Sequence, residues 1–184
     1  MNKPVKPSEL NEIKSAEFME FFNELQSETH RGGVLVGAAF LDEYLRQLLA
    51  AFLIDRKTEV KKLLDKPDSP LGLFSSRILV AYCLGLISRE MYHDLEIIRR
   101  IRNQFAHALH GLSFEDAWVI DECTKLIYPQ NFQFMENFSN ADRFIMTIAI
   151  ISMRLKLTAL GLANEKRQVR KNEEVINVNV PDNN

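Results

Sequence analysis

The sequence contains few of the residues that mark several protein classes. It has 2 cysteines, 7 glycines, 6 prolines and 1 tryptophan among 184 residues. So few turn-forming residues argue against a β-sandwich or barrel, which needs many tight turns. The two cysteines, Cys83 and Cys123, lie in apolar helical patterns. We therefore expect both to be reduced core residues, not a disulfide pair.

The chain also lacks an excess of charge of either sign. Its formal net charge is −2 and its isoelectric point is near 6.1. No global positive field therefore attracts nucleic acid. Any binding of RNA or DNA has to come from a local patch, and the best candidate is the group Arg99, Arg100 and Arg102.

Membrane-targeting features are not expected. The N-terminal segment MNKPVKPSEL has no apolar run typical of a secretion signal. The most hydrophobic stretch, residues 144–153, is about half as long as a membrane span and is flanked by Arg143 and Arg154. We interpret this stretch as a buried helix of a cytoplasmic protein.

Most of the remaining chain carries apolar residues at helical spacing. The sequence breaks at Arg31-Gly-Gly33, and Ser113 with Asp116 suggests a capping box. The expected helices cover residues 8–29, 34–53, 57–64, 73–86, 91–110, 113–128 and 141–163. We predict an all-α fold, a single bundle of five to seven helices over residues 1–164. Residues 165–184 are expected to form a flexible tail, in which 175–180 can form a strand if an edge is available.

The segment 91–110, MYHDLEIIRRIRNQFAHALH, carries the most unusual pattern. An apolar stripe lies nearly opposite a polar stripe of arginine, asparagine and histidine, groups that bind anions or transfer protons near neutral pH. The apolar stripe is Ile98, Ile101, Phe105 and Leu109, and the polar stripe is Glu96, Arg100, Asn103, His107 and His110.

These side chains suit cleavage of RNA without a metal. His107 can act as base or acid, and Arg102 can hold a phosphate and stabilise the transition state. Asn103 can orient the imidazole or a water, while Arg100 and Arg99 are candidate substrate-binding residues. Arg102 and His107 are about 140° apart on an ideal helix. They therefore converge only through the reach of the arginine, a distorted helix end or a second subunit.

The segment Arg102-Asn-Gln-Phe-Ala-His107 resembles the Arg-x4–6-His motif of the HEPN superfamily. That resemblance implies a HEPN-like helical bundle, commonly a dimer with two motifs lining one cleft. Many HEPN proteins are metal-independent ribonucleases of toxin–antitoxin or antiviral systems, and others bind RNA or nucleotides without turnover. It thus implies a homodimer, with RNA as a candidate substrate and an antitoxin as a candidate partner.

A second resemblance covers more of the chain, roughly residues 30–128. The segments SPLGLFSSR (69–77) and AYCLGLI (81–87), followed by the Arg…His helix, are similar to the mannitol-operon repressor family. Its members are helical and are described as transcriptional regulators. The sequence shows no helix-turn-helix or groove-reading basic helix. A repressor of this type therefore implies a regulatory protein partner.

Two function classes follow, a metal-independent endoribonuclease and, as the alternative, a non-catalytic transcriptional regulator acting through protein partners. A purely structural interpretation also stands, because a helix dipole stabilises cations at its C-terminal end. In that case Arg102 pairs with Asp42 or Glu43, and Glu96 neutralises Arg100. We expect no metal, because the histidines lack a further ligand at useful spacing, and no cofactor, because phosphate-binding glycine motifs are absent.

Overall fold

The computed structural model describes residues 19–108, 111–131, 137–163 and 167–168. All regular structure in these ranges is helical, which confirms the predicted all-α bundle. Residues 19–27 form a helix, and the labelled helices follow as α2 (His30–Phe52), α3 (Lys57–Leu64), α4 (Phe74–Cys83), α5 (Arg89–His107), α6 (Ala117–Thr124), α7 (Ile127–Gln130) and α8 (Asn140–Ala163).

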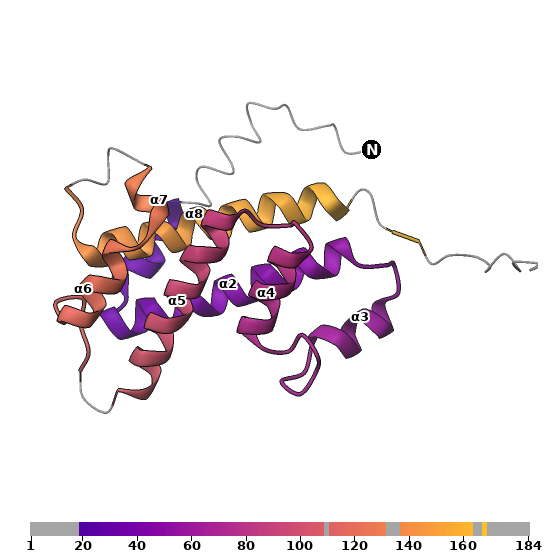
Figure 1. Ribbon diagram of the computed structural model, residues 1–184, viewed down its shortest axis with the longest axis horizontal. Coiled ribbons are helices and arrows are strands. Elements are labelled where there is room, and N and C mark those ends of the chain that lie inside the picture. The colour runs from indigo at the N-terminus through magenta and orange to yellow at the C-terminus, as the bar shows by residue number, and fades with distance from the viewer. Residues whose placement is uncertain (1–18, 109–110, 132–136, 164–166, 169–184) are drawn as a thin grey trace, which may run out of the picture.

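The two longest helices, α2 and α8, lie side by side and run in the same direction (Figure 1). Helix α5 crosses them, and α4 packs against both α2 and α5. The core side chains are almost completely buried, among them Leu41, Leu45, Ile98, Phe105 and Phe144. Each such side chain contributes roughly 1.5–3 kcal/mol on burial, so this core is the main stabilising element.

Gly37 lies where α2 packs tightly against α8. A Cβ atom at Gly37 would lie 2.8 Å from Cδ1 and 3.2 Å from Cγ2 of Ile148, which is itself fully buried. We expect Gly37→Val to lower the free energy of unfolding by about 2 kcal/mol through overpacking. Gly161→Val is the matched control, because a Cβ there meets nothing within 4 Å. Equal urea midpoints for the two variants would contradict this packing.

Helix α2 begins earlier than predicted. The hydroxyl of Thr29 caps it by accepting from the amide of Gly32, so Arg31-Gly-Gly33 lies inside the helix. The predicted break was therefore wrong. Gly33 is buried, and a Cβ there would lie 3.2 Å from both Ile145 Cδ1 and the Leu25 carbonyl oxygen. The glycines allow neighbouring helices to pack closely against α2, and they do not form a turn.

Helix α5 corresponds to the helix predicted over residues 91–110, and Ser88 is its N-cap. It ends at His107, because Ala108 is extended. Arg31 donates to the carbonyl oxygens of Ala106 and Ala108 at 3.1 and 3.3 Å. A side chain from α2 thus satisfies the end of the helix, while residues 109–110 lie outside the described ranges.

The predicted helix 113–128 is replaced by two shorter helices. Asp116, not Ser113, is the N-cap of α6, and its carboxylate accepts from the amide of Ser113. The two residues predicted as a capping box instead form a turn before the helix. The chain then turns between Thr124 and Ile127 into α7, which Asp94 of α5 caps from across the bundle.

The two cysteines have different surroundings. Cys123 is buried, as predicted, and burial raises the pKa of its thiol to about 12, so it stays protonated. Cys83 was predicted to be a core residue and is exposed. It is the last residue of α4, on the side of the helix turned away from buried Ile78 and Ala81.

Helix α8 contains the apolar run 144–153, which is buried as predicted. By length and hydropathy alone it could cross a membrane, but 50% of the apolar window is buried inside the protein. A core helix of a soluble protein passes the same test. Of the predicted tail, only residues 167–168 are described, and Arg167 lies over the Phe52 ring at 3.5 Å.

Candidate functional site

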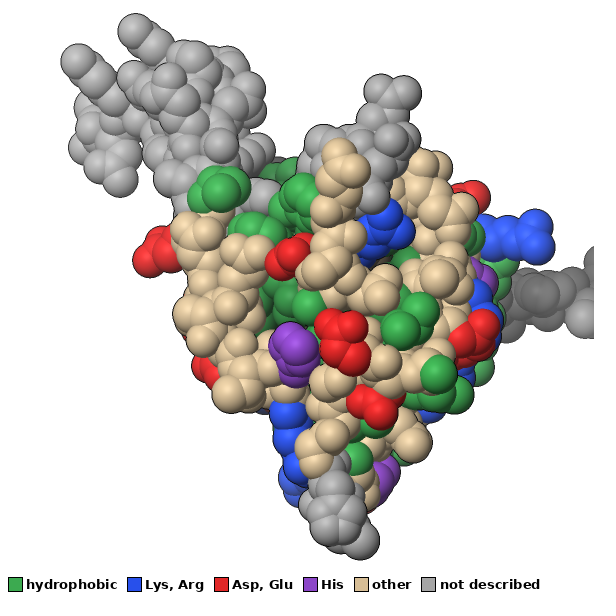
Figure 2. Space-filling model, turned by 90° about the vertical axis from the view of Figure 1, so that its left-hand side faces the viewer, with side chains coloured by type: hydrophobic (Ala, Val, Ile, Leu, Met, Phe, Trp, Pro, Cys, Tyr) green, Lys and Arg blue, Asp and Glu red, His purple; other side chains and the backbone are tan. Residues whose placement is uncertain are grey.

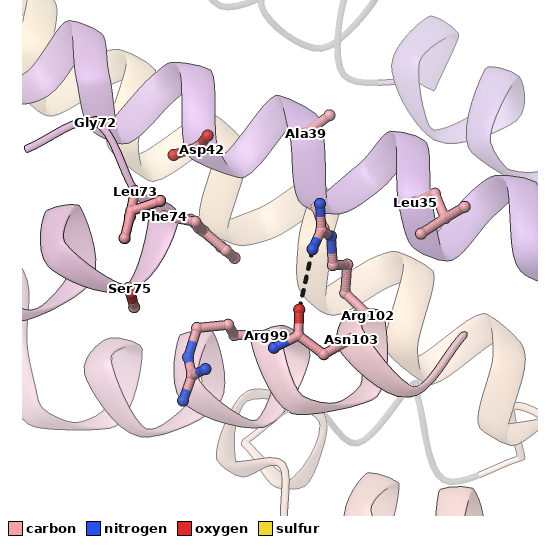
Figure 3. A pocket seen from close by; sticks show the side chains of 11 residues that line it. Leu35, Ala39, Asp42, Gly72, Leu73, Phe74, Ser75, Arg99, Arg102 and Asn103 are labelled. Atoms are coloured by element: carbon pink, nitrogen blue, oxygen red, sulfur yellow. Dashed lines mark hydrogen bonds between the residues drawn. The ribbon is translucent and has the colours of Figure 1, made fainter. Parts of the chain in front are cut away.

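A cavity of about 350 Å³ opens where α2, the start of α4 and the second half of α5 meet (Figure 3). Three of the five predicted site residues line it, namely Arg99, Arg102 and Asn103. The other lining residues are Leu35, Ala38, Ala39, Asp42, Gly72, Leu73, Phe74 and Ser75. One wall is therefore polar and cationic, and the other is largely apolar.

Arg102 reaches from α5 toward α2 (Figure 3). Its Nη1 donates to Oδ1 of Asn103 at 3.0 Å, a neutral partner. The predicted pairing with Asp42 or Glu43 is wrong, because Asp42 pairs with Arg77 at 2.6 Å and Glu43 with Arg46 at 2.8 Å. No described carboxylate lies within ion-pair distance of Arg102, so its charge is not directly neutralised.

Asp42 of α2 faces the cavity (Figure 3). Burial raises the pKa of its carboxyl group above the usual range, and the hydrogen bond and charge of Arg77 partly oppose that rise. The positive charge of Arg102 also lowers the pKa of the Asp42 carboxyl group. Oδ1 of Asp42 accepts from Arg77, whereas Oδ2 accepts no hydrogen bond from the described residues.

The other two arginines of the predicted patch are occupied by carboxylates. Arg99 donates to Glu96 at 2.8 Å, and Arg100 pairs with Glu122 of α6, also at 2.8 Å. The prediction that Glu96 neutralises Arg100 was therefore wrong, because Glu96 pairs with Arg99 and Glu122 pairs with Arg100. Helical spacing identifies Glu96 as a neighbour, but it cannot show that α6 brings Glu122 to Arg100.

The Glu122 ion pairs make stability sensitive to acid. Burial alone would raise the pKa of Glu122, but hydrogen bonds from Lys125 and Arg100 outweigh burial and hold it below the usual 4.5. Their stabilisation is therefore complete above that value and is lost as the pH falls through the lowered pKa.

We expect Glu122→Gln to cost about 1 kcal/mol near neutral pH and to flatten the loss of stability between about pH 5 and pH 3. Urea unfolding at both ends of this range measures the effect. Glu115→Gln is the control, because Glu115 is exposed and its carboxylate makes no recorded ion pair. A variant as stable as wild type near neutral pH would show that the pairs contribute nothing.

His107 does not line the cavity that holds Arg102 and Asn103. It is the exposed last residue of α5, and the helix keeps regular geometry up to that point. The end of α5 therefore does not supply the distortion that would bring the imidazole round to Arg102 within one chain. A catalytic role for His107 with Arg102 remains a prediction that needs a second subunit.

Two contributors to the site were not identified from the sequence. They are Arg77, which holds Asp42 in place, and Ser75, which lines the cavity. The sequence feature that could have identified them is the serine pair followed by arginine in SPLGLFSSR (69–77). This segment had been used only for its similarity to the mannitol-operon repressor family. Among the residues that the structure describes, no group of three histidine, cysteine, aspartate or glutamate side chains could hold a metal.

Comparison with solved structures gives a match to a chain in the X-ray structure of the MtlR–HPr complex from Escherichia coli. The TM-score is 0.62 at 21% identity, and the match covers 77% of this chain and 99% of that chain. This likeness establishes the fold. Two curated relatives, the mannitol operon repressors of Escherichia coli strain K12 and strain CFT073, are each 38% identical over 60 residues. That segment is 33% of this chain and 30% of either relative.

The family model described as mannitol repressor matches residues 16–175, which include every described helix. The predicted resemblance to this family is confirmed over a longer stretch than residues 30–128. The relation to HEPN proteins stays a prediction. The chain belongs to the mannitol repressor family.

Proposed function

We propose that the protein is a non-catalytic transcriptional regulator of the mannitol-repressor type that acts through a protein partner. The match of the repressor family model to residues 16–175 carries this proposal. The solved structure of the same fold is a complex with HPr, and we therefore take an HPr-type protein as the partner class. A cytoplasmic location fits such a role.

The charges of the predicted arginine patch support a partner other than nucleic acid. Arg99 and Arg100 are each paired with a carboxylate, which leaves Arg102 as the member of the predicted patch without one. On the end of the bundle seen in Figure 2, acidic, basic and apolar side chains are mixed, without a continuous basic surface. Backbone phosphates need several unpaired cations for tight binding.

The direct test is calorimetric titration of the full chain with HPr from the same host. We expect saturable binding, and we expect the chain alone to give no sequence-specific shift of operator DNA. Absence of binding to phosphorylated and unphosphorylated HPr would overturn the assignment of the partner. A specific shift by the chain alone would overturn the indirect mechanism.

The endoribonuclease stays the competing prediction, and the Arg102–His107 motif is its support. It predicts that the pure protein cuts mixed RNA in EDTA to fragments with cyclic phosphate ends, and that His107→Ala abolishes cutting. The regulator predicts intact RNA in the same assay. Analytical ultracentrifugation adds a check, because the nuclease needs two motifs in one dimer.

A further inference from the structure

We propose that the cavity between α2, α4 and α5 binds a small phosphorylated polyol, with the phosphate at Arg102 and the hydroxyl groups at Asp42. This inference goes beyond the proposed function, since it concerns a small-molecule site that can be assayed without any partner protein. It depends on the distribution of donors, acceptors and apolar atoms around the cavity.

The cationic end of the cavity suits an anion. Arg102 is exposed, and among the described residues it donates to Oδ1 of Asn103 alone, so its remaining N–H groups are available. The amide nitrogen of Asn103 also makes no recorded hydrogen bond within the described residues. A guanidinium binds phosphate through two parallel hydrogen bonds, and a neighbouring amide adds a further donor.

The N-terminal end of α4 gives weaker support for an anion in this cavity. Leu73 precedes the helix and provides no side-chain cap, and the first turn, with Phe74 and Ser75, lines the cavity. The first amides of a helix have no partner within the helix and favour negative charge. This helix end is an addition to the Arg102–Asn103 pair and would not constitute a site without it.

The other end of the cavity suits hydroxyl groups. Asp42 has one carboxylate oxygen, Oδ2, without a recorded donor, while its partner Arg77 keeps Oδ1 in place at the cavity wall. Ser75 of α4 also lines the cavity and lies away from Arg102 (Figure 3). A carboxylate accepts hydrogen bonds from hydroxyl groups but repels an anion, so it selects the orientation of a ligand that has both.

The size and the apolar wall limit the ligand further. Leu35, Ala38 and Ala39 of α2, together with Leu73 and Phe74, provide surface for carbon atoms. A volume of about 350 Å³ lies at the lower end of the range for small-molecule sites. A nucleic-acid strand would extend out of such a cavity, whereas a short phosphorylated chain of hydroxylated carbons fits within its volume.

The experiment is isothermal titration of the full chain with mannitol monophosphate, mannitol and inorganic phosphate. We expect the phosphorylated polyol to bind at least about 10-fold more tightly than either half alone, because only it engages both ends. Arg102→Gln should weaken it by about 10- to 100-fold. Ala39→Met, which fills the cavity from an exposed helix position, should abolish binding.

Arg89→Gln is the matched control, because Arg89 is an exposed arginine of the same helix outside the cavity, and it should bind as wild type does. Three results would overturn the proposal. One is the absence of binding by mannitol monophosphate. The second is equal affinity for inorganic phosphate, which would leave a plain anion site. The third is unchanged affinity in Arg102→Gln, with circular dichroism confirming that the variant is folded.

Discussion

Replacement of Asp94 by alanine should lower the free energy of unfolding by about 3 kcal/mol. The side chain of Asp94, in the first half of α5, is completely buried. Its carboxylate accepts hydrogen bonds from the amides of Ile127 and Tyr128, each at 2.9 Å. Alanine would leave the amides of buried Tyr128 and half-buried Ile127 without this acceptor and would remove the hydrogen bonds that join α7 to α5.

Thermal and urea unfolding followed by circular dichroism measure this effect. Asp94→Asn keeps one acceptor oxygen, so we expect a loss of about half that size. Asp68→Ala is the control, because Asp68 is exposed in the loop before α4. An unfolding midpoint for Asp94→Ala equal to that of the control would show that the two amides are satisfied in another way.

The second large effect is expected at Arg77, whose side chain is buried although it is charged. It donates to the carbonyl oxygens of Leu71 and Leu64 at 2.9 and 2.7 Å and to Asp42 at 2.6 Å. One guanidinium therefore joins α4 to the end of α3, to the following loop and to α2. Arg77→Met should cost about 3–5 kcal/mol, because it leaves a partly buried carboxylate and two carbonyl groups without their donor.

Arg77→Lys separates charge from geometry. A lysine restores the charge but cannot satisfy three acceptors in a plane, so we expect it to recover only part of the loss. Denaturant unfolding of both variants beside Arg89→Met, an exposed arginine-to-methionine change, gives the comparison. The double variant Arg77→Met with Asp42→Asn should lose less than the sum of the single changes. Strict additivity would mean that the ion pair has no coupling energy.

The helices were predictable where apolar spacing and end signals agreed. Helix α3 and the interior of α5 and α8 lie where the periodicity placed them. The glycine pair after Arg31 was misinterpreted, because local propensity cannot show that α8 needs close approach at that point. Asp94 was not identified for the same reason, since its partners on α7 are more than 30 residues away.

The candidate site was predictable in composition but not in connectivity. The sequence indicated Arg99, Arg102 and Asn103, and all three line one cavity. It could not assign the partners that other helices supply, because Glu122, which pairs with Arg100, lies on α6, and Asp42, which pairs with Arg77, lies on α2. The angular separation of Arg102 and His107 was calculable from the helix period, and the regular end of α5 leaves it uncorrected.

The side-by-side packing of α2 and α8 affects how the protein is made. These helices come from opposite ends of the described chain, and the leucines of α2 have no apolar cover on that side until α8 exists. During translation α2 leaves the ribosome long before α8. The apolar surface of α2 that α8 later covers is therefore exposed to solvent in the nascent chain. A late-forming contact of this kind slows folding and exposes the nascent chain to aggregation. Expression should therefore depend on chaperones that shield the first half of the polypeptide.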